Sequence, residues 1–291
     1  MALGSNGQRR RIAVTGGSGK LGRVVVRHLA DRGDEVVSLD RTPDPDWDGA
    51  FVRVDLTDYG QVAEVLTGID DRYDRIDAVV HLAAIPAPGL IPNAATFANN
   101  ITSSFHVYQA AKLANITKIV WASSETVLGL PFDTPPDYLP VDEDVHRPES
   151  TYSLVKHLEE TMAVQFCRWN PELSMIGLRF SNVMVPADYA GFEDFQDDPT
   201  VRKWNYWSYI DARDGAAAVA CALDHDQPGA DVFVIANPDS VMRTPTAELL
   251  AQVAPDVPLR RELGEHEPGL DSTKARTVLG WTPQHSWRDH V

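Results

Sequence analysis

Tyr152 and Lys156 stand four residues apart in a stretch with helical periodicity. Four residues make about one helical turn, so both side chains are expected on the same face of the helix. A phenol with its usual pKa of about 10 is a poor base at neutral pH, and a nearby ammonium favours the phenolate. Ser124, expected at the end of the preceding strand, can bind the same substrate oxygen. We predict that these three residues are catalytic and remove a hydroxyl proton while hydride leaves the attached carbon.

A glycine-rich stretch, residues 15–22, lies between the first expected strand and the first expected helix. Glycines at 16, 19 and 22 permit a sharp turn, close approach of a pyrophosphate, and close packing of the helix on the sheet. The free N–H groups and the dipole at the helix N-terminus favour phosphate groups. The pattern therefore predicts a dinucleotide cofactor.

The second expected strand ends at Asp40, followed by Arg41. A carboxylate at this place can accept hydrogen bonds from both ribose hydroxyls of adenosine and would repel a 2′-phosphate. The guanidinium of Arg41 favours NADP instead, because it can pair with that phosphate. We expect NAD in preference to NADP. The structural alternative is that Asp40 is only a turn residue.

Short apolar strands that alternate with helices position these groups. Such continuous apolar strands are typical of a parallel sheet that is covered on both faces. Right-handed crossovers then predict an α/β, doubly wound parallel sheet, the Rossmann fold, with a small C-terminal substrate lobe. Expected strands are 12–15, 35–39, 51–54, 78–82, 119–122, 175–179 and 232–235, and expected helices are 20–31, 58–66, 93–114, 152–169, 214–223, one opened by Thr244–Pro245, and 272–279.

The expected domain organisation has three parts. Residues 1–10 form a flexible tail, residues 11–180 form the NAD-binding Rossmann core with the catalytic residues, and residues 181–291 are mainly a substrate-binding lobe with elements that return to the core. Five prolines between 130 and 150 predict a surface loop. The lobe shows no obvious core of its own.

Composition limits the partners. The 291 residues are 43% hydrophobic and 23% charged, which is typical of a globular chain, and 26 basic against 42 acidic residues leave a net charge of −16. Such a charge disfavours nucleic acid and anionic membranes as partners. The two cysteines, Cys167 and Cys221, form neither a disulfide framework nor a metal cluster. With no signal peptide and no apolar stretch long enough to span a bilayer, we expect a cytoplasmic protein without a metal site.

Taken together, the motifs resemble those of the extended short-chain dehydrogenase/reductases, the NAD-dependent epimerase/dehydratase group, along residues 12–287. The matching segments are TGGSGKLG (15–22), Asp40, VDL (54–56), HLAA (81–84), NNI (99–101), SSETVLG (123–129), YSLVK (152–156), RFSNV (179–183) and LGWTP (279–283).

Together with the glycine loop and the end of the second strand, the resemblance implies a set of site residues. It also implies a homodimer formed through helices 93–114 and 151–169. The expected cofactor-binding residues are Gly16, Gly19, Lys20, Leu21, Gly22, Asp40, Arg41, Asp55, Leu56, Leu82, Ala83, Ala84, Asn99, Tyr152, Lys156 and Ser181. The expected substrate residues are Ser124, Glu125, Asn182, Trp204 and Trp207. We interpret His81, Gly280 and Trp281 as structural.

Two departures from the family limit which reactions and substrates are expected. Dehydratases of the group follow their catalytic threonine with an Asp-Glu pair, whereas Glu125 and Thr126 follow Ser124 here, so elimination of water lacks its second acid. Glu125 is then a substrate contact or a solvated residue. Trp207 stands where many nucleotide-sugar enzymes have an arginine that binds a diphosphate; it can stack on a sugar ring or belong to the lobe core.

These departures favour a small substrate, similar to that of the uronate dehydrogenases of the same superfamily, although Arg202 and Lys203 could replace the missing arginine. The leading hypothesis is an NAD-dependent oxidoreductase that transfers hydride at a secondary alcohol or hemiacetal of a sugar-like molecule. One alternative is a nucleotide-sugar epimerase, similar to UDP-glucose 4-epimerase, which returns the hydride. Another is a non-catalytic NAD(P)-binding sensor, which the retained Ser124, Tyr152 and Lys156 disfavour.

Overall fold

A seven-stranded parallel sheet forms the centre of the computed structural model, which describes residues 9–68, 73 and 75–290. The strand order is β3-β2-β1-β4-β5-β6-β9. The strands are β1 (Arg11–Thr15), β2 (Glu35–Asp40), β3 (Ala50–Arg53), β4 (Ala78–His81), β5 (Lys118–Ser124), β6 (Ser174–Phe180) and β9 (Gly229–Ile235). All six neighbouring pairs run parallel, which confirms the doubly wound α/β fold.

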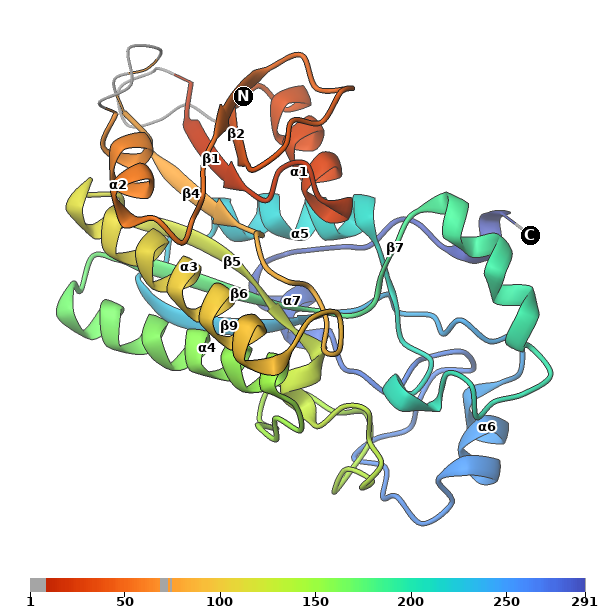
Figure 1. Ribbon diagram of the computed structural model, residues 1–291. Helices are drawn as coiled ribbons and strands as arrows, with labels where there is room; N and C mark the ends of the chain where they lie inside the picture. Colours follow the sequence, from red (N-terminus) through yellow and green to blue (C-terminus); the bar gives the residue numbers. More distant parts are fainter. Residues whose placement is uncertain (1–8, 69–72, 74, 291) are drawn as a thin grey trace.

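Helices cover both faces of the sheet (Figure 1). On one face, α1 (Lys20–Asp31) and α5 (Ala212–Asp224) share an apolar cluster with the strands, joined by α7 (Thr273–Val278). On the other face, α2 (Tyr59–Thr67), α3 (Asn93–Leu113) and α4 (Thr151–Trp169) form a second cluster. The strands are therefore apolar on both sides, as their continuous hydrophobic sequences predict.

The order of the strands reverses between β1 and β4, and ligands of such sheets bind at the carboxyl ends of the strands near that point. Thr15, Asp40, His81 and Ser124 are polar residues that end strands near this point. The sheet thus brings together groups that are far apart in the sequence.

The C-terminal lobe has a hydrophobic cluster of its own, so the expectation that it lacks a separate core is wrong. Its elements are β7 (Val183–Met184), η2 (Pro186–Phe195), η3 (Lys203–Asn205), β8 (Ile210–Asp211), α6 (Thr246–Val253) and η4 (Trp287–His290). The cluster joins aromatic residues such as Tyr206, Trp207 and Trp287 to residues of the 128–141 segment. Figure 1 shows this lobe beside the carboxyl edge of the sheet.

The proline-rich segment is also more than a surface loop. Leu130, Phe132, Leu139 and Val141 are buried in the lobe cluster, and Leu139 and Val141 form bridges with Leu259 and Leu270. The prolines mark the irregular backbone, but they carry no information about which face the apolar side chains cover.

Most expected elements lie within two residues of their predicted bounds. The helix expected to be opened by Thr244–Pro245 is α6, which begins at Thr246 with Pro245 as its N-cap. Of the expected tail, residues 1–8 lie outside the described part of the chain. Arg10, which we assigned to the tail, donates hydrogen bonds to Asp34 and Asp224. None of the described helices is both long enough and apolar enough to cross a membrane.

Candidate active site

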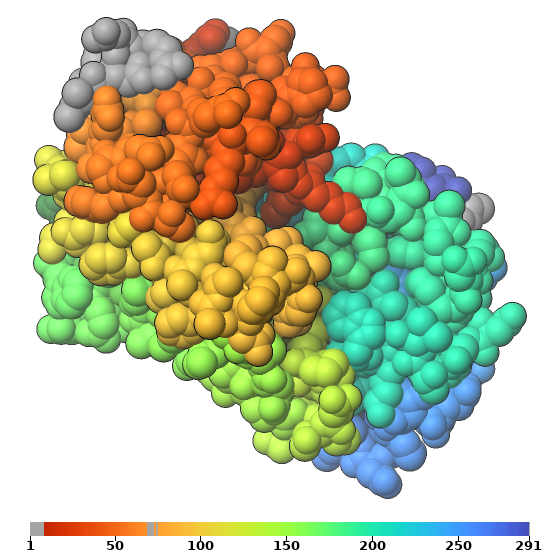
Figure 2. Space-filling model, in the orientation of Figure 1, coloured from red at the N-terminus to blue at the C-terminus, as the bar shows by residue number. Residues whose placement is uncertain are grey.

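A cavity of about 1210 Å³ follows the carboxyl edge of the sheet and extends under the lobe. Figure 2 shows the surface hollowed where the red and orange N-terminal part meets the green-to-cyan segment of the lobe. Most of the predicted site residues line the cavity: Gly16, Gly19, Lys20, Leu21, Gly22, Asp40, Arg41, Leu56, Leu82, Ala83, Ala84, Asn99, Ser124, Glu125, Tyr152, Lys156, Ser181, Asn182 and Trp204.

The glycine loop packs at distances that only glycine permits. Gly16 has a φ of +70°, and a Cβ atom there would lie 2.7 Å from the backbone nitrogen of Ala83. A Cβ atom on Gly22 would lie 2.0 Å from the carbonyl oxygen of Gly16. Helix α1 begins directly after this loop, and no side chain caps its N-terminus. Such a cradle of backbone N–H groups fits a pyrophosphate.

Asp40 lines the cavity at the end of β2, where its Oδ2 accepts a hydrogen bond from the Ser18 backbone N–H at 3.1 Å. The guanidinium of Arg41 donates to Asp55 Oδ1 at 2.9 Å. This hydrogen bond, with those from Thr57, lowers the pKa of Asp55 to about 2. Asp55 is not among the residues that line the cavity, and its side chain binds Arg41 and Thr57; its contact with the cofactor stays a prediction.

Tyr152, Ser124 and Lys156 come together as predicted. Tyr152 is the second residue of α4, whose first turn is closed by a capping box between Ser150 and Ser153. The buried phenol lies beside Ser124 at the end of β5, and Lys156 Nζ lies 5.9 Å from the centre of its ring.

Lys156 lowers the pKa of Tyr152, as expected, but this effect alone does not make the phenol acidic. Burial raises the pKa of Tyr152, and this effect outweighs the lowering by Lys156 and by the hydrogen bond to Ser124. Lys156 Nζ donates to the Ala122 carbonyl at 2.7 Å and to Glu159 Oε2 at 2.9 Å. Sequence reasoning missed Glu159, although an acid three residues after a helical lysine lies on the same face.

Glu125 is a buried acid beside Ser124 in the cavity. Ser181 Oγ donates to its Oε2 at 2.6 Å, and Asn205 Nδ2 lies 3.4 Å from each carboxylate oxygen. Burial raises the pKa of Glu125 to about 7, although Ser181 and Arg202 act in the opposite direction. Ser181 is thus held by Glu125. Glu125 is a cavity residue, which excludes the alternative of a solvated surface acid.

The two tryptophans predicted to contact substrate differ in position. Trp204 lines the cavity, and the Arg202 guanidinium stacks 5.0 Å from the centre of its ring. Trp207 is fully buried, is not among the lining residues, and donates its Nε1–H to the Pro199 carbonyl. The prediction that Trp207 faces a substrate is wrong, because its ring completes the lobe core.

Sequence reasoning missed the other lining residues, several of which belong to the loop after β4. These are Ser18, Leu39, Thr42, Val54, Ile85, Pro86, Ala87, Pro88, Ile91, Ala95, Ser103, Ala122, Ser123, Thr126, Leu130, Pro131, Ser150, Phe180 and Val183. Ser18, Val54, Ser123, Thr126, Phe180 and Val183 lie within motifs quoted above, but the others carry no motif. Only their proximity to the strand ends could have indicated them.

His81 and Trp281 occupy structural positions, in agreement with their interpretation from the sequence. His81 is buried between Thr15 and Ser104, and burial lowers the pKa of its imidazole to about 3. Trp281 is fully buried and donates its Nε1–H to the Asp214 carbonyl.

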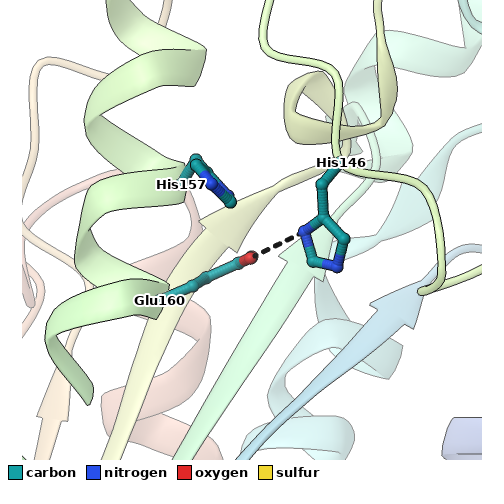
Figure 3. A group of neighbouring side chains, drawn as sticks. All are labelled: His146, His157 and Glu160. Carbon is teal, nitrogen blue, oxygen red and sulfur yellow. Dashed lines mark ion pairs between the residues drawn. The ribbon is translucent and has the colours of Figure 1, made fainter. Parts of the chain in front are cut away.

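Three side chains that could bind a metal, His146, His157 and Glu160, converge beside α4 (Figure 3). Both Glu160 oxygens accept hydrogen bonds from the Arg179 guanidinium at 2.9 Å, and Ser123 Oγ donates to Oε1 at 2.6 Å. Arg179 Nη2 also lies 2.9 Å from His146 Nδ1. A guanidinium in this position repels a cation, so the group anchors α4 to β6 and does not suit a metal.

Comparison with known proteins agrees with this geometry. The model of the NAD dependent epimerase/dehydratase family matches residues 12–236. The chain belongs to this family. The match confirms the predicted family, the fold and an NAD-dependent enzyme.

Individual relatives are of two kinds. The chain is 28% identical to a UDP-glucose 4-epimerase of Lactobacillus helveticus, over 97% of this chain and 94% of that protein. It is 33% identical to an L-arabinose 1-dehydrogenase (NAD(P)(+)) of Haloferax volcanii, over 79% of this chain and 89% of that protein. Among solved structures, an NAD-bound short-chain dehydrogenase/reductase superfamily protein of Agrobacterium tumefaciens has a TM-score of 0.73 at 23% identity, covering 97% and 94% of the two chains.

Glu125→Gln tests the buried acid through stability. The folded protein holds the Glu125 proton up to a pKa of about 7, whereas the unfolded chain releases it near its ordinary value of 4.5. The contribution of Glu125 to the free energy of unfolding of the wild type is therefore lost as the pH rises from 4.5 to 7. The unfolding free energy of the variant, relative to wild type, should rise between pH 5 and pH 8 by up to roughly 3 kcal/mol.

Urea unfolding at both pH values measures this difference. Glu64→Gln removes the same charge from an exposed position and serves as the control. An equal difference at pH 5 and pH 8 would show that Glu125 is ionised throughout this range.

Proposed function

We propose that this protein is an NAD-dependent dehydrogenase that oxidises a hydroxyl group of a small, uncharged sugar. The distribution of charge along the cavity carries the proposal. Among the described lining residues, the basic ones are Lys20 and Arg41 near the glycine loop and Lys156, which is paired with Glu159. The part that we call the substrate end, formed by Ser124, Glu125, Thr126, Asn182 and Trp204, contains an acid and no base.

This charge pattern discriminates between classes of sugar. A nucleotide-sugar diphosphate would meet no basic side chain at the substrate end, and Arg202 points its guanidinium toward Trp204 and the Ser208 carbonyl. The carboxylate of a uronic acid would face the acid of Glu125. Sugar hydroxyls can instead pair with serine, threonine, amide and carboxyl groups, and a tryptophan face can stack on a sugar ring.

The residues have the following proposed roles. When NAD is bound, it supplies the hydride acceptor. Its pyrophosphate would lie on the glycine loop and its adenosine ribose at Asp40. The other cofactor-binding residues that were predicted from the sequence and line the cavity would surround it. As a phenolate, Tyr152 takes the proton of the substrate hydroxyl at Oη, and Ser124 holds the same oxygen. An ammonium has three donors, so Lys156 keeps one free for the nicotinamide ribose. We also propose residues 11–180 as the cofactor-binding part and 181–291 as mainly the substrate-binding part.

A panel of substrates with purified protein and NAD tests the function. Free aldoses such as L-arabinose should produce NADH, and uronic acids should react at least tenfold more slowly. Tyr152→Phe should lower kcat by about 10²–10⁴, the range of general acid–base catalysis. Tyr59→Phe, an exposed tyrosine on α2, is the matched control. Unchanged turnover in Tyr152→Phe would contradict the assigned base.

An epimerase is the second candidate, because relatives of that activity align with 97% of the chain. The same panel separates the two functions. Interconversion of UDP-glucose and UDP-galactose, without net NADH and without turnover of free aldoses, would favour the epimerase and contradict the dehydrogenase.

The cofactor preference is tested at Asp40. Asp40→Ala removes an acceptor of charge-assisted hydrogen bonds, which contribute about 1.5–3 kcal/mol each. Calorimetric titration should show a Kd for NAD at least tenfold higher, with a smaller change for NADP. Asp48→Ala, an exposed acid in the same connection, is the control. Equal or tighter binding of NADP by the wild type would contradict the preference.

A homodimer is proposed from the outer surface of α3 and α4. Large apolar side chains are exposed there, including Phe97, Phe105, Leu154 and Val164. Burial of such a surface in a second copy would be favourable. Sedimentation of the wild type should show a dimer. The double variant Phe105→Asp, Val164→Asp should be a monomer. The control Val201→Asp, which changes an equally exposed apolar position in the lobe, should remain a dimer. A monomeric wild type would contradict the proposal.

A further inference from the structure

The catalytic lysine has a buried carboxylate partner. Lys156 and Glu159 have side-chain exposures of 3% and 0%, and their charged atoms are 2.9 Å apart. Burial by itself would lower the pKa of Lys156, but Glu159 and its neighbours more than offset this and raise it. The ammonium therefore stays charged beside Tyr152, at the cost of a second buried charge.

Glu159 is the end point of a hydrogen-bonded chain that starts beneath the glycine loop. Thr15 Oγ1 lies 2.7 Å from His81 Nδ1, His81 Nε2 lies 3.0 Å from Ser104 Oγ, and Ser104 Oγ donates to Glu159 Oε1 at 2.7 Å. The chain connects β1, β4, α3 and α4, and its members are buried.

The direction of these bonds follows from the donors and acceptors. His81 is neutral, so one ring nitrogen donates and the other accepts. Ser104 donates to the carboxylate and therefore accepts from His81 Nε2, which leaves His81 Nδ1 to accept from Thr15. Thr15 Oγ1 in turn accepts from the Ala83 N–H. This tautomer pairs every donor with an acceptor and directs every bond toward Glu159.

Burial raises the pKa of Glu159, whereas Lys156 and a chain with this polarity act in the opposite direction and stabilise its negative charge. Its far end, Thr15, is fully buried, so the chain gives a proton no route to solvent. Its role is consequently electrostatic and positional. Both oxygens of Glu159 receive hydrogen bonds, one from Lys156 and one from Ser104, and such satisfied buried charges are strongly coupled.

We propose that Glu159 is a positioning residue of the dehydrogenase: as the buried counter-ion of Lys156 it holds the ammonium in place and offsets its charge at the Tyr152 phenol. The kinetic part of this inference rests on the proposed function. The other charged or titratable groups that face this pair are Tyr152 and Glu160 on α4, His81 on β4, Tyr108 on α3, and Glu125 after β5.

The counter-ion contributes to the protonation state of the phenol. Lys156 lowers the pKa of Tyr152, whereas Glu159 and Glu125 raise it, in addition to the larger effect of burial. Removing the charge of Glu159 while its shape is kept leaves the attraction of Lys156 uncompensated. Tyr152 should then ionise at a lower pH than in the wild type.

Glu159→Gln tests this inference in the NAD-bound protein. The rising limb of the pH profile of kcat/KM should move to lower pH by at least about one unit, which corresponds to 1.36 kcal/mol of interaction. Ser104→Ala, which removes only the supporting hydrogen bond, should give a smaller shift in the same direction. Glu159→Asp should restore most of the wild-type profile. Glu64→Gln, at an exposed position on α2, should leave the profile unchanged.

A lower rate with an unmoved pH profile in both Glu159→Gln and Ser104→Ala would overturn the inference, because a merely structural role changes the rate without moving the limb. If Glu159→Gln does not fold, Ser104→Ala decides the outcome by the same criterion.

Phenolate absorbance provides a second readout without turnover. The alkaline titration of each protein minus that of its Tyr152→Phe counterpart isolates Tyr152. Glu159→Gln should shift this difference titration to lower pH, and an unshifted titration would overturn the inference. If no free sugar is oxidised, the proposed function fails, and this titration still decides the role of Glu159.

Discussion

The attachment of α4 to the sheet is the constraint on which the site depends. Two adjacent acids on this helix point to different partners: Glu160 binds Arg179 of β6, and Glu159 binds Lys156 and Ser104. These buried pairs are costly to break, because the partner left behind would be an uncompensated charge. The bonds that leave the helix, from Glu160 to Arg179, from Glu159 to Ser104 and from Lys156 to the Ala122 carbonyl, fix the rotation of α4 about its axis and so place Tyr152 beside Ser124. The catalytic geometry therefore depends on electrostatics beneath the cavity as much as on the residues that line it.

Charge is distributed unevenly along the cavity. The glycine loop and the uncapped start of α1 provide positive potential where a pyrophosphate fits, while Glu125 is the acid of the substrate end. A side chain such as Glu125, held by Ser181 and close to Asn205, cannot easily leave its position to admit an anion. The fold is shared with enzymes of several activities, so the proposed function rests on this local charge pattern and not on the fold.

The lobe and the proline-rich segment form one structural unit. Tyr206, Trp207 and Trp287 pack with Leu130, Phe132 and Leu139, so the substrate end is lined by segments that lie far apart in the chain. This packing explains why Trp207 is unavailable to a ligand while Trp204, three residues earlier, reaches the cavity. In an irregular segment, neither helical nor strand periodicity indicates which side chains point inward.

The sequence by itself determined the alternation of strands and helices, the glycine cradle, the Tyr152–Lys156 pair and the position of Asp40, because each depends on local periodicity or on the spacing within one turn. Only the tertiary structure decided the placement of Glu125, the burial of Trp207, the ion pair of Asp55 with Arg41, and the chain from Thr15 to Glu159. These features join side chains from different strands and helices, and burial then changes the free energy of their charges. Neither distance nor burial can be read from spacing along the chain, so the chemical groups were predictable and their electrostatic states were not.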